Sequence, residues 1–201
     1  MTNSNDLYTV RAARETDIPQ ILDIYNERIL NSTCLFMYNQ VSLDNRLTWF
    51  VETKAKGYPI IVATEKETDK AIAYACLGGF RPHTAYVLTT EISIYVHQDH
   101  QRKGLGVRLL KELLRIGTEM KFKNIQACIT SENEGSVALF SKYGFKHAGH
   151  LRDVGYKFGR FLDVVFLEYI TDVQVEKDKA VPAFKPFPWK TYVYTEKLYD
   201  N

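Results

Sequence analysis

The spacing of apolar residues divides the first 170 residues into alternating helical and extended stretches. Between residues 16 and 29 the apolar positions recur every three or four residues, which predicts an amphipathic helix. Thr16 is its expected cap and Pro19 lies in its first turn. A second helix is predicted from Ser42, its cap, to about Lys56, where Gly57 ends it. Two more helices are predicted over residues 104–121 and 133–143.

The stretches between these helices are rich in β-branched and aromatic residues, which favours strands. The predicted strands cover residues 8–11, 60–64, 71–76, 86–96, 124–129, 146–154 and 160–170. A chain of 201 residues suits one domain, and these elements predict a single α/β domain over residues 1–170.

The last thirty residues have a different character. Three prolines between residues 181 and 190 exclude a helix, whereas residues 191–199 alternate as in a strand. Residues 171–201 are too aromatic for a disordered tail, so we expect an ordered extension packed on the domain or on a second subunit.

Composition narrows the class of protein. The chain is 45% hydrophobic and 25% charged, with a net charge of +2 and no block of like charges, which disfavours a nucleic-acid or anionic-membrane binder. Neither a signal peptide nor an apolar run of membrane-spanning length is present, so we expect a cytoplasmic protein. The odd number of cysteines, Cys34, Cys76 and Cys128, favours reduced core side chains.

The most informative stretch is the loop that joins a strand to the helix at residue 104. A helix N-terminus presents unpaired N–H groups and partial positive charge, and Gly104 and Gly106 would let an anion approach the backbone. Arg102 and Lys103 add charge beside it. The alternative is a tight turn with a solvated basic edge. A Walker A loop is absent, and a dinucleotide fingerprint would need a third glycine.

Two motifs in this order resemble the GNAT acetyltransferases. Residues 101–106, QRKGLG, are similar to the family's pyrophosphate loop, and residues 131–145 resemble its second signature. Segments 79–82, 85–86, 90–91, 94–96 and 154–159, with Asp163, resemble the subgroup that acetylates phosphinothricin and methionine sulfoximine or sulfone. The resemblance implies a mixed, splayed sheet flanked by about four helices, direct acetyl transfer from acetyl-CoA to a small amino-acid-like amine, and a homodimer.

The resemblance also implies residue roles for the cofactor. The backbone of the strand ending at residue 96 would hold the thioester and the pantetheine arm, the loop would hold the pyrophosphate, and the helix from Asn133 would contact the arm. The implied acetyl-CoA residues are Ile94, Tyr95, Val96, Gln101, Arg102, Lys103, Gly104, Leu105, Gly106, Val107, Asn133, Ser136 and Phe140.

Glu91 lies on the strand that enters this loop, and the match of its surroundings, Tyr86, Thr90 and Tyr95, to the subgroup implies that it is the general base. The alternative is a glutamate on a solvated strand face. Phe140 departs from the family, which has tyrosine or histidine there, and a phenyl ring donates no proton. Tyr143, one turn further, is expected to be a packing residue rather than a substitute acid.

The acceptor would need a cation for its carboxylate. Arg81 and His83 match positions near the acceptor in the subgroup, although simple solvation is the alternative for Arg81. Phe36 and Tyr86 are expected apolar walls, and Tyr74 is either a wall or core. The histidines lack metal-ligand spacing, so we expect no metal.

Two other functions remain open. One is acetylation of a different amine, such as a protein N-terminus. The other is a CoA-binding protein with weak or no catalysis, for which Phe140 is the best support.

Overall fold

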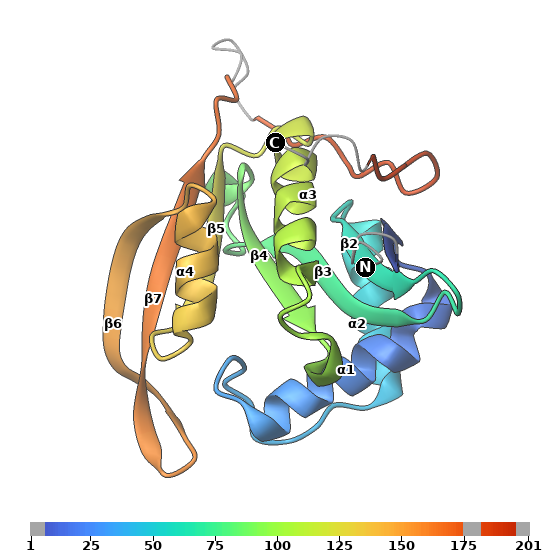
Figure 1. The fold of residues 1–201 in the computed structure, drawn as a ribbon. Helices are drawn as coiled ribbons and strands as arrows, with labels where there is room; N and C mark the ends of the chain where they lie inside the picture. The colour runs from blue at the N-terminus through green and yellow to red at the C-terminus, as the bar shows by residue number, and fades with distance from the viewer. Residues whose placement is uncertain (1–6, 175–181, 196–201) are drawn as a thin grey trace.

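The architecture is a seven-stranded sheet covered by helices on both faces (Figure 1). The computed structural model describes residues 7–174 and 182–195. The strand order is β1-β2-β3-β4-β5-β7-β6. The strands are β1 (Tyr8–Ala12), β2 (Ile60–Glu65), β3 (Ala71–Gly79), β4 (Thr89–Val96), β5 (Asn124–Thr130), β6 (Lys146–Lys157) and β7 (Arg160–Ile170). The α-helices of the described residues are α1 (Ile18–Asn31), α2 (Leu43–Ala55), α3 (Leu105–Glu119) and α4 (Glu134–Lys142). The predicted mixed α/β fold with four helices is therefore confirmed.

The sheet is splayed at its centre. Every pair of neighbouring strands is antiparallel except β4 and β5, which are parallel. These two pair in register only at Thr89, Thr90 and Glu91 of β4, and in Figure 1 they diverge toward the end of β4. The main-chain groups of β4 beyond Glu91 are therefore not paired with β5.

Two hydrophobic clusters hold the layers together. Alternation along β2 sends Ile61 and Ala63 into the cluster on the α3 side, and Ile60 and Val62 into the cluster on the α1–α2 side. The α3 side includes the leucines of α3 and Phe140 of α4. The other cluster holds Ile18, Ile21 and Ile24 of α1 together with Phe50 and Tyr74, which makes Tyr74 a core residue.

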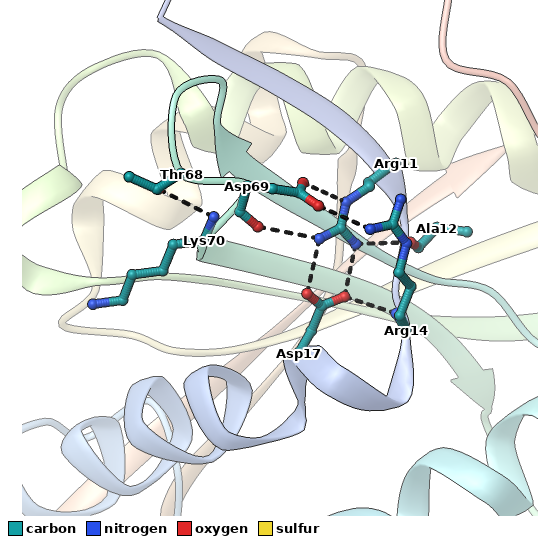
Figure 2. Close-up of polar contacts among 7 residues, drawn as sticks. All are labelled: Arg11, Ala12, Arg14, Asp17, Thr68, Asp69 and Lys70. Atoms are coloured by element: carbon teal, nitrogen blue, oxygen red, sulfur yellow. Dashed lines mark hydrogen bonds and ion pairs between the residues drawn. The ribbon is translucent and has the colours of Figure 1, made fainter.

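The start of α1 differs from the prediction. A 3₁₀ turn over Glu15–Asp17 precedes the helix, so Asp17 rather than Thr16 occupies the N-cap position. The Asp17 carboxylate accepts from the backbone N–H of Arg14 at 2.7 Å and from both terminal nitrogens of Arg11 at 2.7 and 2.9 Å (Figure 2). Asp69 binds the same two arginines. A charged cluster that joins β1 to the β2–β3 turn therefore decides where α1 begins. At α2 the predicted cap is confirmed, since Ser42 Oγ accepts from the Asn45 N–H.

The C-terminal extension packs along the α3 side of the domain. Phe187 is buried in that core cluster, and its N–H donates to the Gly57 carbonyl. The Lys185 N–H donates to Met120, at the end of α3. Residues 191–195 form no strand, and the rest of the predicted strand, residues 196–199, lies outside the described residues.

Two further predictions are corrected. The strand predicted from residue 86 begins at Thr89, because Thr84–Tyr86 form a 3₁₀ turn. Cys128 is exposed rather than part of the core, because alternation along β5 sends Ile125, Ala127 and Ile129 to the α3 side and Cys128 to the other face. Within the described residues, no helix is long and apolar enough to cross a membrane.

Candidate active site

A cavity of about 820 Å³ opens where β4 diverges from β5. It is bounded by the end of β4, the loop before α3, the first turns of α3 and α4, and the C-terminus of α1. All the residues predicted to hold acetyl-CoA line it except Lys103. Those that line it are Ile94, Tyr95, Val96, Gln101, Arg102, Gly104, Leu105, Gly106, Val107, Asn133, Ser136 and Phe140. The structure therefore brings three stretches of the chain, residues 94–96, 101–107 and 133–140, to one cavity.

The loop before α3 has the backbone geometry of an anion site. Gly104 occupies the N-cap position of α3 with φ = 81°, a left-handed conformation that favours glycine. A Cβ at Gly104 would meet no atom within 4 Å, so the backbone is open on that side. The first turn of α3 begins at the cavity wall with Leu105, Gly106 and Val107. Partial positive charge and unpaired N–H groups therefore collect there.

Glu91 lies further back along β4, where the split begins. Alternation places its side chain with those of Ser93 and Tyr95, on the face that α1 and α2 cover, since Ile92 packs in the α3-side cluster. Burial raises the pKa of the Glu91 carboxyl, and the nearby Arg81 guanidinium opposes that rise. Glu91 does not line the large cavity; it lies three positions before Ile94, a distance of about 10 Å along the strand.

A smaller cavity of about 60 Å³ adjoins the large one along β4. It shares Cys34, Tyr95 and Phe140 with the large cavity and extends to Ile92, the residue after Glu91. The smaller cavity therefore continues along β4 from Ile94 back to Ile92, and Glu91 does not line it.

The residues predicted to bind the acceptor are less well assembled. Arg81, His83 and Tyr86 are exposed in the turn between β3 and β4, and the His83 and Tyr86 rings lie 6.5 Å apart. Arg81 is close enough to lower the pKa of Glu91. Phe36 lies elsewhere, with its ring against Gly155 of β6. None of the four lines either cavity.

Phe140 belongs to the buried core and also faces the cavities. It is 5% exposed and packs edge to face on Phe145, with ring centroids 4.9 Å apart. It also lines both cavities. Tyr143 packs against the same core cluster, as predicted for a packing residue.

Sequence reasoning missed the contribution of α1 and of the β6–β7 turn. The additional lining residues are Arg28, Asn31, Ser32, Thr33, Cys34, His100, Glu132, Gly135, Leu139, Phe158 and Arg160. His100, Glu132, Gly135 and Leu139 lie beside or within the two motifs. The other residues have no local spacing that marks them, because they reach the cavity only through tertiary contacts.

Two of the missed residues, Arg28 and Arg160, bind side chains in the loops that precede α3 and α4. Arg28 forms an ion pair with Glu27, and the Gln101 carboxamide oxygen, turned toward Arg28, accepts from both of its terminal nitrogens at 3.0 and 3.1 Å. Glu132 accepts from Thr33 at 2.7 Å and pairs with both terminal nitrogens of Arg160. Arg160, and next Thr33, lower the pKa of Glu132 to about 2. These contacts join α1 and the β6–β7 turn to the two loops at the cavity.

Comparison with known proteins gives one consistent result. The family described as acetyltransferase (GNAT) domain matches residues 10–166. The chain is 37% identical over 164 residues, 82% of this chain and 95% of the relative, to the L-methionine sulfoximine/L-methionine sulfone acetyltransferase of Pseudomonas aeruginosa. It is 35% identical over 170 residues, 85% of this chain and 98% of the relative, to the L-amino acid N-acyltransferase MnaT of Escherichia coli.

A solved structure agrees with these relatives. The phosphinothricin acetyltransferase from Sinorhizobium meliloti in complex with AcCoA superposes with a TM-score of 0.79 and 32% identity. The match covers 82% of this chain and 88% of that one. The fold and the sequence therefore point to the same family.

Proposed function

Because this chain belongs to the GNAT acetyltransferase family and is an N-acetyltransferase, we propose that it transfers acetyl from acetyl-CoA to the amine of a small amino-acid-like molecule. The observation that carries the proposal is the alignment of three features along β4: Glu91, the split from β5, and the open Gly104 loop. The relatives named for methionine sulfoximine, methionine sulfone and phosphinothricin support this acceptor class.

Acetyl-CoA fits the donor groups of the large cavity. Gly104 leaves the backbone open to a pyrophosphate, and the first N–H groups of α3 are the donors that such an anion needs. We assign Arg102, and Lys103 at the loop surface, to flanking charge. The N–H groups of β4 between Ile94 and Val96 that face away from β3 would hold the thioester carbonyl, whose carbon is the electrophile, and stabilise its oxyanion. Asn133, Ser136 and Phe140 would contact the pantetheine arm.

Glu91 is assigned as the general base. An amino-acid α-amine has a pKa of about 8, so most of it is protonated at neutral pH and cannot attack a carbonyl. Glu91 takes a proton from the ammonium group, and the neutral amine then attacks the thioester carbon to form the new C–N bond. The nitrogen loses its second proton to solvent as the C–S bond breaks. CoA leaves as a thiolate, whose conjugate acid has a pKa of about 8.5, and takes its proton from solvent. The reaction therefore needs no proton donor at the position of Phe140.

Arg81 and His83 are assigned to the carboxylate of the acceptor. Both lie in the turn before β4, on the side of the sheet centre where Glu91 lies, and Arg81 acts electrostatically on Glu91. Tyr86, in the same turn, and Phe36 would provide apolar contacts. An exposed arginine is available for a ligand carboxylate, which it can bind with two parallel hydrogen bonds.

We also propose a cytoplasmic homodimer without nucleic-acid or membrane partners. The β6–β7 hairpin exposes the apolar side chains Leu151, Val154, Tyr156, Phe158 and Phe161, a composition that suits contact with a second copy. The free cysteines Cys34, Cys76 and Cys128 support a reducing compartment. Analytical ultracentrifugation would test the dimer directly.

The function is tested by measuring thiol release from acetyl-CoA against a panel of acceptors. The panel should contain methionine sulfoximine, methionine sulfone, phosphinothricin, unmodified amino acids and peptides with free N-termini. Rapid turnover with the first three, and little with peptides, is the expected result. Preference for peptides would favour the protein N-terminus alternative, and tight CoA binding without turnover would favour the non-catalytic one.

A further inference from the structure

The segment between α1 and α2 forms a wall of the site without regular structure of its own. Residues 32–38, here called the wall segment, contain neither helix nor strand. Ser32, Thr33 and Cys34 line the large cavity, and Cys34 also lines the smaller one with Ser93 and Tyr95. Ser93 and Tyr95 share the sheet face of Glu91, so the wall segment lies on the acceptor side rather than the α3 side.

A buried lysine holds this segment. Lys157, the last residue of β6, is 3% exposed. Its ammonium donates to the backbone carbonyls of Ile29 at 2.6 Å, Ser32 at 2.8 Å and Leu35 at 2.7 Å. An ammonium has three N–H donors, and all three are therefore used. The C-terminus of α1, which carries partial negative charge, and the start of the wall segment are thus bound to one cation.

Two neighbours of Lys157 contact the same segment. The Tyr38 hydroxyl donates to the Tyr156 carbonyl at 2.5 Å. The ring of Phe36 lies so close to Gly155 that a Cβ there would come within 2.1 Å of Phe36 Cε2. Gly155, Tyr156 and Lys157 therefore each contact the wall segment or the end of α1.

We propose that Lys157 is a positioning residue, which fixes the wall segment so that the acceptor amine is held in the split of the sheet beside Glu91. The inference rests on the proposed function, because it assumes an acceptor on this face. The loop from Gln101 to Val107, which anchors acetyl-CoA in that proposal, receives none of the Lys157 hydrogen bonds. Binding of the two substrates should therefore respond differently when the lysine is removed.

The primary test replaces Lys157 with methionine, which keeps the length of the side chain and removes its donors. Three carbonyls, that of Ile29 buried and those of Ser32 and Leu35 partly buried, would lose this partner, so the wall segment would shift. The expected result is an acceptor KM raised about tenfold or more, with the Kd for acetyl-CoA changed by less than about threefold. Lys146→Met, at the exposed start of the same strand, is the matched control and should change neither value.

A second pair of variants keeps the proposal falsifiable if Lys157→Met does not fold. Gly155→Ala displaces the Phe36 ring, and Tyr38→Phe removes a single hydrogen bond of a side chain that is 65% exposed. Both should raise the acceptor KM, Gly155→Ala more strongly, while acetyl-CoA affinity is kept.

The possible results distinguish the positioning role of Lys157 from the proposed acetyl transfer itself. An active wild-type enzyme whose folded Lys157→Met or Gly155→Ala variant keeps the wild-type acceptor KM would overturn the positioning role alone. Equal losses of acceptor and acetyl-CoA binding would also overturn it. A wild-type protein that acetylates no acceptor would overturn the proposed function, and this inference with it.

Discussion

Glu91 of β4 lies directly opposite Gln126 of β5, and this is the last pair before the two strands separate. The Gln126 amide donates to Asn124 at 2.7 Å and to Glu168 at 3.3 Å, so its side chain is fixed at the closed end of the split. Glu91 therefore lies at the closed end of the split, beside a fixed Gln126 side chain. The position of the proposed base is therefore set by the pairing of β4 with β5.

Gly104 should be essential for acetyl-CoA binding because of both its conformation and its place. Gly104→Glu adds a negative charge where a pyrophosphate would lie, and the variant should bind acetyl-CoA too weakly for calorimetry to detect. Gly104→Asn is the matched control, because asparagine tolerates φ = 81° better than other side chains and adds no charge. The control should keep measurable affinity. Wild-type affinity in a folded Gly104→Glu variant would refute the anion site.

Phe140→Leu should separate packing from chemistry. The leucine keeps part of the contact with Phe145, so we expect a loss of about 1–2 kcal/mol in the free energy of unfolding, a raised KM for acetyl-CoA, and a kcat within about threefold of wild type. Phe140→His should leave kcat unchanged or raise it modestly. The measurement is steady-state kinetics at saturating acetyl-CoA. A collapse of kcat in the leucine variant with intact CoA affinity would mean that the ring orders the thioester.

Arg81 should set the pH range in which Glu91 works. Burial raises the pKa of Glu91 and Arg81 lowers it, so Arg81→Met should raise it further. A base acts only when deprotonated, so activity is lost as the pH falls through this pKa. The acidic limb of kcat, measured at saturating acceptor, should therefore move to higher pH.

The control for this charge change is Lys70→Met. Lys70 is exposed just before β3, at the end opposite Gly78, the partner of Glu91. The span of β3 places it beyond the Debye length of about 10 Å at 0.1 M salt. Its substitution should leave the acidic limb in place. An unmoved limb in Arg81→Met as well would show that Arg81 does not act on the base.

The C-terminal extension should contribute stability rather than catalysis. The Tyr192 hydroxyl donates at 2.7 Å to Glu112, which is fully buried and also bound to Arg115. Tyr192→Phe should lower the free energy of unfolding by about 1–3 kcal/mol, because a buried carboxylate loses a donor. Denaturant unfolding measures this loss, with Val193→Ala, at a site that is 74% exposed, as the neutral control. Equal stability of both variants would contradict the structural role of the extension.

The regular elements could be predicted from the sequence because apolar periodicity reports directly on burial. The stripe of α3 and the alternation along β2 both correspond to faces of the observed core. Ser42 and Gly57 marked the ends of α2 because caps act locally. Thr16 was wrongly predicted as the cap of α1. The start of this helix depends on the cluster around Arg11 and Asp69, which joins residues more than fifty positions apart.

The site was predictable only where it is a local motif. The backbone geometry of the loop around Gly104 is set by a few consecutive residues, so the sequence pattern alone predicted an anion site there. The wall segment could not be predicted, because Lys157 reaches it across more than 120 residues of chain. Cys34 and Arg160 reach the cavity in the same way, through contacts that leave no spacing in the sequence.

The most direct test of the account follows N-acetylation of methionine sulfone by mass spectrometry, with wild type and Glu91→Gln compared across pH. The account predicts an N-acetylated product from the wild type and a fall in kcat of about 100-fold or more in the variant, with a flattened acidic limb. The glutamine keeps the shape of the side chain and loses only the base. Absence of acetylated product from the wild type, or a variant that keeps both kcat and the acidic limb, would contradict the account.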